Sequence, residues 1–185
     1  MRATLGSVAA VRVLTTAAAY RGAAAAFAEV VATGLFSDAA LASVDALDRR
    51  SAQDPGVVAE VTGADLVVLV EGAALHARSV WRGTALGQTL ATVNVLAVGS
   101  VASVLGVTMI DPRGGAPTTG LGLFGDVVLT LKTGVAQDER TQSLVGAVDT
   151  LVELGPLSVV AYDGRWRVVS DEGLVLSRAG QATTL

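Results

Sequence analysis

The sequence contains no cysteine, one histidine and one lysine. Without cysteine, the chain forms no disulfide and has no thiolate for metal binding or catalysis. Its single imidazole, His76, cannot build a histidine-rich metal site or a recognisable serine–histidine–aspartate arrangement. With Lys132 as its only lysine and a net charge of −4, the chain lacks the basic surface that nucleic acid requires. We therefore predict no metal, no cofactor and no nucleic-acid partner.

Charged and aromatic side chains are also scarce. Of the 185 residues, 16% are charged and 4% are aromatic, whereas 51% are hydrophobic. Soluble domains usually carry about 25% charged residues, so this chain has few with which to cover its surface. The imbalance predicts that part of the apolar surface is buried against other chains. The N-terminus lacks a continuous apolar run with a cleavage site, and we expect no signal peptide.

One long stretch, residues 83–110, contains no charged side chain and could cross a bilayer as a helix by its length. It is interrupted by Gln88, Asn94 and several glycines. Residues 89–98 are rich in β-branched side chains, which favour strands. We therefore predict no membrane span.

Short valine-rich runs separated by glycine, proline or polar clusters fill most of the chain. This spacing is typical of an antiparallel sandwich or barrel. The predicted fold is mainly β, with antiparallel β-sandwich or barrel-like units, one or two in tandem, and at most a short N-terminal helix. The predicted units are residues 1–83 and 84–185. The runs are 57–63, 64–72 and 77–83 in the first, and 89–98, 101–110, 125–134, 150–155, 158–163, 165–170 and 173–178 in the second.

The alanine-rich start, residues 8–36, is compatible with helix or strand. Alanine favours helix, but two glycines and a β-branched pair interrupt the stretch. A short helix over 8–14 followed by a strand over 27–32 fits these interruptions. Residues 51–56, Ser-Ala-Gln-Asp-Pro-Gly, are predicted to form a loop, because Asp-Pro favours a turn.

The clearest local pattern is an Asp-Gly pair between two β-prone runs near the C-terminus. It predicts a hairpin with a two-residue turn at Asp163 and Gly164, because Gly adopts positive φ freely and Asp tolerates it. That register sets Tyr162 opposite Arg165. It also places Trp166 on the other face from Tyr162.

The hairpin brings together a candidate contact surface. Aromatic rings beside arginine can stack on sugars, and they can equally form a cation–π pair that closes the end of a sheet. Both interpretations remain open. The residues concerned are Tyr162, Arg165, Trp166 and Arg167.

Other patterns carry weaker signals. Two adjacent acidic pairs, Asp138-Glu139 and Asp171-Glu172, could supply the carboxylates of a glycosidase, but both fall in predicted turns, where acids are ordinarily solvated. Residues 120–125 read Gly-Leu-Gly-Leu-Phe-Gly, which matches the dinucleotide-binding spacing. A strand-like run follows in place of the required helix, so no nucleotide site is predicted.

The segment VAYDGRWRVVS at 160–170, with GDVVLTLKTG at 125–134, resembles the β-module of bacteriophage tail fibres, tail spikes and head fibres. More distantly, residues 20–38 and the closing SVWRG at 79–83 are similar to the N-terminal unit of such fibres. The resemblance implies a non-enzymatic, homotrimeric virion protein, a structural or host-attachment component without catalytic residues.

The same resemblance implies particular partners and a location. The chain would assemble with copies of itself and with other virion proteins, contact a host surface glycan, and reside in a phage or phage-like particle as a fibre, spike or capsid-decorating component. Two alternatives are a carbohydrate-active enzyme on a β scaffold and a soluble ligand-binding β-barrel.

Overall fold

The computed structural model describes residues 8–110, 117–125, 127–131, 143, 150–179 and 181–183. The chain divides into two compact units, residues 1–101 and 102–185. The strands of the first unit are β1 (Ala10–Leu14), β2 (Ala40–Val44), β3 (Leu66–Leu69) and β4 (Val95–Ala97). Its helices are α2 (Ala23–Ala32), α3 (Pro55–Thr62), α4 (Ala74–Trp81) and α5 (Ala85–Thr89). Short 3-10 turns are η1 (Thr16–Ala18), η2 (Ser51–Gln53) and η3 (Gly99–Leu105), the last of which follows β4.

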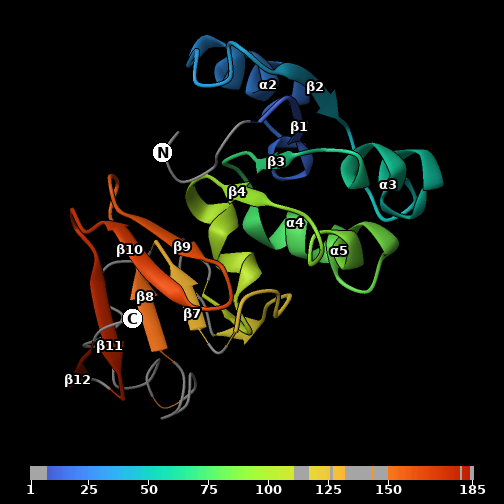
Figure 1. Cartoon of the computed structure of the whole chain (residues 1–185). Helices are drawn as coiled ribbons and strands as arrows, with labels where there is room; N and C mark the ends of the chain where they lie inside the picture. Colours follow the sequence, from blue (N-terminus) through green and yellow to red (C-terminus); the bar gives the residue numbers. More distant parts are fainter. Residues whose placement is uncertain are drawn as a thin grey trace. The chain divides into compact units, whose positions relative to one another are not determined.

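The sheet of the first unit is entirely parallel, in the order β2-β1-β3-β4 (Figure 1). Val13 of β1 lies between Ser43 of β2 and Val68 of β3. All four residues of β3 are buried, as expected where helices cover both faces of a parallel sheet. Figure 1 shows α3, α4 and α5 grouped together, apart from α2.

At the start of the chain, the predicted order of helix and strand is reversed. Residues 10–14 form β1, and residues 23–32 form α2. Val11 and Val13 are fully buried, and Phe27 of α2 packs against the cluster that they form. Alternating Val in β1 is a strand pattern, whereas the alanines of α2 let a helix approach the sheet closely.

The predicted loop at 51–56 and the predicted strand at 57–63 are also wrong. Asp54 is the N-cap of α3, and its carboxylate accepts the N–H groups of Gly56 at 2.7 Å and Val57 at 3.3 Å. Pro55 occupies the first helical position, where its missing N–H costs nothing. The Asp-Pro-Gly sequence therefore begins a helix.

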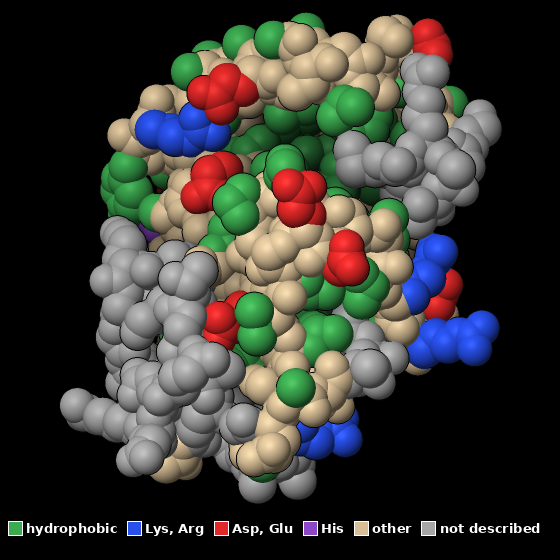
Figure 2. Space-filling model, turned by 90° about the vertical axis from the view of Figure 1, so that its left-hand side faces the viewer, with side chains coloured by type: hydrophobic (Ala, Val, Ile, Leu, Met, Phe, Trp, Pro, Cys, Tyr) green, Lys and Arg blue, Asp and Glu red, His purple; other side chains and the backbone are tan. Residues whose placement is uncertain are grey.

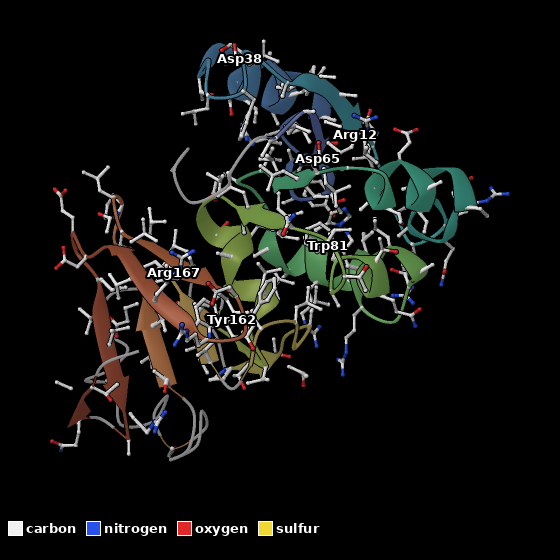
Figure 3. All side chains as sticks on the ribbon, in the orientation of Figure 1. Arg12, Asp38, Asp65, Trp81, Tyr162 and Arg167 are labelled. Carbon is white, nitrogen blue, oxygen red and sulfur yellow. The ribbon has the colours of Figure 1, made fainter. Side chains whose placement is uncertain are left out.

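The predicted strand at 77–83 is part of helix α4. Its buried residues recur at helical spacing, which a strand would not produce: Ala74, Ala77, Val80 and Trp81. Figure 3 labels the Trp81 side chain within this unit. The boundary predicted near Gly83 falls between α4 and α5, where Gly83 adopts a positive φ of 68°.

The second unit contains a six-stranded sheet of mixed direction, in the order β12-β11-β8-β7-β5-β6. Its strands are β5 (Thr108–Met109), β6 (Thr118–Thr119), β7 (Val127–Thr130), β8 (Thr150–Glu153), β11 (Val175–Arg178) and β12 (Gln181–Ala182). The pairs β5–β7 and β7–β8 are parallel. The pairs β5–β6, β8–β11 and β11–β12 are antiparallel. The central strands β7 and β8 are completely buried.

A separate two-stranded hairpin consists of β9 (Val159–Tyr162) and β10 (Trp166–Ser170). The predicted hairpin is confirmed, and Gly164 has the expected positive φ, 94°. Its predicted register is wrong by one residue, because Trp166 pairs with Tyr162. Three residues therefore connect the strands, and Tyr162 and Trp166 share a face.

The prediction of a mainly antiparallel β fold is wrong, because the chain is a mixed α/β protein. Valine-rich runs such as 57–61 suggested strands, but capping and helical spacing place them in helices. Strands β3 and β7 are continuous apolar runs because each is buried between parallel neighbours, and not because its residues alternate in a sandwich. Among the described residues, no helix is long and apolar enough to span a membrane.

Candidate functional site

The carboxyl ends of the parallel strands in the first unit define its candidate site. In the strand order β2-β1-β3-β4, the chain adds β2 on one side of β1 and then crosses to add β3 and β4 on the other side. The point between β1 and β3 is therefore a topological switch point, and ligands of open α/β sheets bind outside the carboxyl ends of the strands near such a point. Glu71 and Gly72 follow β3, and Gly99 and Ser100 follow β4. Adjacent parallel strands place these four residues at the same edge.

Ser100 stands on a sharp turn between a strand and a helix. Gly99, immediately before it, has a φ of 68°, in the left-handed region that favours glycine. The 3-10 helix η3 begins at this turn. A strand, a tight turn and a helix form the geometry that presents nucleophilic serines in α/β hydrolases, although the sequence Val-Gly-Ser-Val-Ala lacks both glycines of the G-x-S-x-G motif.

The Glu71 carboxylate engages Ser100 through both oxygens. Ser100 Oγ lies 2.6 Å from Oε1 of Glu71, and the backbone N–H of Ser100 donates to Oε2 at 2.5 Å. Ser100 Oγ also lies 2.6 Å from the carbonyl oxygen of Gly72. A hydroxyl has one proton to donate, so Ser100 Oγ can donate a hydrogen bond to the Glu71 carboxylate or to the Gly72 carbonyl, but not to both at once.

Two glycines make this arrangement possible. A Cβ at position 99 would overlap the carboxylate of Glu71, so only glycine admits that side chain. A Cβ at position 72 would overlap the carbonyl of Ala17, which also accepts the N–H of Ala73 at 2.7 Å. The loops after β1 and β3 therefore meet backbone to backbone, and this contact fixes the segment that carries Glu71.

Arg21 supports the same segment from the loop after η1. Its Nε donates to the carbonyl of Glu71 at 3.2 Å, and its Nη1 lies 2.8 Å from both carboxylate oxygens of Glu29. Glu29 belongs to α2. A chain of charge-assisted contacts thus runs from α2 through Arg21 to the backbone of Glu71.

Both ring nitrogens of His76 have partners other than Ser100 and Glu71. Its Nε2 lies 2.9 Å from the carbonyl oxygen of Leu47, and its Nδ1 lies 3.2 Å from the hydroxyl of Tyr20. Because a carbonyl only accepts, Nε2 carries a proton, and in the neutral ring Nδ1 then accepts from the Tyr20 hydroxyl. The rings of Tyr20 and His76 meet edge to face at 4.9 Å. Both ring nitrogens are therefore engaged.

The acidic pairs noted in the sequence form no paired site in the described residues. Asp171 lines a hollow of about 470 Å³ in the second unit, and it is the one acid among the described lining residues. Its other lining residues are Val168, Leu174, Val175, Leu176, Ala182 and Thr183. The pair Asp138-Glu139 lies outside the described residues.

The predicted aromatic and arginine group is brought together on the hairpin. The rings of Tyr162 and Trp166 lie 5.0 Å apart, and Phe124 joins them at 5.7 and 6.4 Å. Arg167 forms an ion pair with Asp163 at 3.6 Å, and Arg165 is exposed at the turn. Figure 3 labels Tyr162 and Arg167 on this hairpin. The group remains a predicted contact surface.

The glycine-rich segment 120–125 connects β6 to β7, so a strand follows it and not a helix. Gly120 and Gly122 donate their N–H groups to the carbonyls of Val107 and Gly106. Within the part of the chain that the structure describes, no three acidic or histidine side chains are grouped to hold a metal ion.

Sequence reasoning missed both Ser100 and Glu71. The available signal was a pair of valine-rich runs that end in Glu-Gly and in Gly-Ser, at 66–72 and 95–100. Had these runs been recognised as adjacent parallel strands, their ends would have been expected at one edge of the sheet. The antiparallel interpretation removed that expectation.

No protein-family model matches the chain, and no curated protein matches its sequence. Among solved structures, the fold is similar to the crystal structure of a peptidase from an acI-B1 Actinobacterium. The TM-score is 0.64 at 15% identity, and the match covers 95% of this chain and 83% of that one.

This likeness corrects the function predicted from the fibre resemblance. The predictions of a non-enzymatic structural protein, tail fibre, head fibre or capsid decoration are wrong, because the chain has an α/β fold that a peptidase also has. The alternative of a ligand-binding β-barrel fails for the same reason. At 15% identity, the comparison shows that the two proteins share their fold.

Proposed function

We propose that this protein is a serine hydrolase that cleaves amide bonds, with Ser100 as the nucleophile and Glu71 as its general base. The observation that carries the proposal is the 2.6 Å contact between Ser100 Oγ and Oε1 of Glu71, on a strand–turn–helix elbow. A nucleophile within hydrogen-bonding distance of a base is the arrangement that covalent acyl transfer requires.

The chemistry needs only these two side chains and water. As Ser100 Oγ attacks the acyl carbon, its proton passes to the Glu71 carboxylate. Glu71 then returns that proton to the departing amine, which leaves an acyl ester on Ser100. Glu71 then takes a proton from water as the water attacks the ester, and it returns that proton to Ser100 Oγ as the acid product leaves.

Two further observations support this choice of reaction. The elbow lies at the carboxyl edge of a parallel sheet, where α/β enzymes carry their sites. The solved structure with the shared fold is named a peptidase, which favours amide bonds as the substrate class. Because both nitrogens of His76 are engaged elsewhere, a carboxylate takes the place that an imidazole holds in a triad.

The test is covalent labelling with an alkyl fluorophosphonate. Ser100 Oγ would form a bond to phosphorus, fluoride would leave, and Glu71 would take the serine proton. Mass spectrometry should locate the adduct on Ser100, and Ser100→Ala should abolish it. Glu71→Gln, which keeps the shape but removes the base, should slow labelling by about 100-fold or more.

Ser79→Ala is the matched control, because Ser79 is an exposed serine whose hydroxyl donates to the carbonyl of His76. Its labelling rate should equal that of the wild type.

In parallel, a mixture of peptides is incubated with each protein and the cleavage products are identified. An adduct that survives Ser100→Ala, or the absence of both adduct and cleavage in folded wild-type protein, would overturn the proposal.

A further inference from the structure

The second unit exposes a concentrated set of large apolar side chains. In its described part, they all lie between residues 157 and 175. They are Leu157, Val159, Tyr162, Val168, Val169 and Val175. Across the face drawn in Figure 2, charged side chains stand singly or in small groups among hydrophobic and neutral areas. Exposed apolar clusters of this kind mark interaction surfaces.

The two edges of the β9–β10 hairpin differ in how far they are protected against pairing with another strand. The register of β10 shifts between Val168 and Ser170, a bulge that twists an edge away from pairing. Two acidic residues, Asp171 and Glu172, follow it directly. Strand β9 has no charged residue, no proline and no register shift of its own. Among the described residues, β10 is the one strand that pairs with β9, so the outer edge of β9 is the one open to another strand.

The two ends of the hairpin carry opposite charge. The turn end bears Arg165 and Arg167 against a single acid, Asp163, which gives a net charge of +1. The other end bears Asp171 and Glu172, a net charge of −2. An antiparallel partner of the same sequence would set the positive end of each hairpin beside the negative end of the other, whereas a parallel one would oppose like charges.

We propose that two copies of this chain associate through β9, antiparallel and related by a two-fold axis at Val160. Val159 of each copy then faces Ala161 of the second copy, and Ser158 faces Tyr162. The hairpins become one four-stranded sheet, which gives each two-stranded unit the neighbours that it needs for stability. The contact is self-complementary, as a two-fold interface requires. This inference does not depend on the proposed hydrolase activity.

The charge pattern provides a direct test by size-exclusion chromatography with light scattering. The wild type should elute as a dimer at low salt. The double variant R165E/R167E makes both hairpin ends acidic, and D171K/E172K makes both basic. Each variant alone should associate at least about tenfold more weakly than the wild type, and high salt should reduce the difference.

A one-to-one mixture of the two double variants supplies the decisive measurement. Each variant then meets an end of opposite sign at both contacts, so dimers should form again. Asp163→Asn is the control for the ion pair between Asp163 and Arg167, and it should leave the wild-type dimer intact. A wild type that is monomeric at every concentration, or a mixture that stays monomeric while both variants remain folded by circular dichroism, would overturn the proposal.

Discussion

Nε1 of Trp81 donates a 3.1 Å hydrogen bond to Oγ1 of Thr16, and both side chains are completely buried. The Thr16 hydroxyl in turn donates to the carbonyl of Ala46 at 2.7 Å. One hydroxyl thus connects helix α4, turn η1 and the loop that follows β2. The Trp81 N–H, the Thr16 hydroxyl and the Ala46 carbonyl are all buried, so water cannot replace a lost partner. This hydroxyl should therefore contribute more to stability than an average hydrogen bond.

Replacing Thr16 by Val keeps the shape of the side chain but removes the hydroxyl. The Trp81 N–H and the Ala46 carbonyl then each lose a buried partner, at about 1–3 kcal/mol for each group left unsatisfied. We expect the free energy of unfolding of the first unit to fall by about 2–6 kcal/mol. Urea unfolding in a Trp166→Phe background measures this, because Trp81 is then the only tryptophan and reports on its own unit.

Thr16→Ser is the matched control. It retains the donor and acceptor and removes one methyl group, so it should cost about 1 kcal/mol. If the valine and serine variants unfold at the same urea concentration, the hydroxyl contributes nothing and the prediction is wrong.

Gly72 provides a test of the close approach beside the site. Its missing Cβ leaves room for the carbonyl of Ala17, and no flexible side chain stands there to move aside. Gly72→Ala should therefore push the loops after β1 and β3 apart, at a cost of about 1–3 kcal/mol, and displace Glu71 from Ser100. Thermal unfolding and the rate of fluorophosphonate labelling measure the two effects.

Gly63→Ala serves as the control for Gly72. The nearest atom to a Cβ at position 63 is the Ala59 carbonyl oxygen at 3.4 Å, an ordinary contact. This variant should be as stable as the wild type within about 0.5 kcal/mol and label at the same rate. Equal behaviour of the two variants would mean that the contact with Ala17 does not position Glu71.

The parts of the fold that could be predicted are those fixed by local patterns. Leu66–Leu69 is a short apolar run bounded by polar and glycine residues, and it is a strand. Gly164 fixed the position of the hairpin, but a third residue in the loop shifted its register. The helix at Pro55–Thr62 carried a capping signal, Asp54 before Pro55, that competed with the β preference of its valines.

The candidate site could not be predicted because it depends on strand direction. Glu71 and Ser100 are 29 residues apart, and they meet only because β3 and β4 are adjacent and parallel. Periodicity indicates where strands lie, but it does not give their order in a sheet. Without that order, nothing in the sequence distinguishes Ser100 from the other serines.

The acid dependence of stability should include a contribution from Asp65. Its Oδ2 accepts the N–H groups of Ala10 at 2.8 Å and Ala9 at 2.9 Å, and these bonds lower the pKa of Asp65 below its usual 3.8. Because the pKa of Asp65 is lowered in the folded state, the stabilisation is fully present above pH 3.8. It is lost as the pH falls through the pKa that Asp65 has in the folded protein. Asp65 is labelled in Figure 3.

Asp65→Asn should therefore be less stable than the wild type at pH 7, and the two proteins should converge as the pH falls below 3.8 and through the lowered pKa of Asp65. Urea unfolding at a series of pH values measures the difference. Asp48→Asn should behave in the same way, because hydrogen bonds from Ser51 lower the pKa of Asp48. A constant offset between Asp65→Asn and the wild type at every pH would contradict this account.

Arg21 should act as a positioning residue for the proposed reaction. It donates to the backbone carbonyl of Glu71 at 3.2 Å and is held by Glu29 at 2.8 Å, so its loss should let Glu71 move relative to Ser100. Arg21→Gln should slow fluorophosphonate labelling of Ser100 several-fold. Its stability should change by less than about 1 kcal/mol, because the pair with Glu29 is exposed.

Two further variants separate positioning from a general effect of charge. Glu29→Gln should slow labelling less than Arg21→Gln, because the bond from Arg21 to Glu71 remains. Arg50→Gln removes an exposed arginine that, in the described contacts, has no hydrogen bond or ion pair with Glu71 or Ser100, and its labelling should match the wild type. Equal slowing in Arg21→Gln and Arg50→Gln, which both remove one positive charge, would assign the effect to net charge. An unchanged rate in Arg21→Gln would show that the contact between Gly72 and Ala17 is sufficient to hold Glu71 in place.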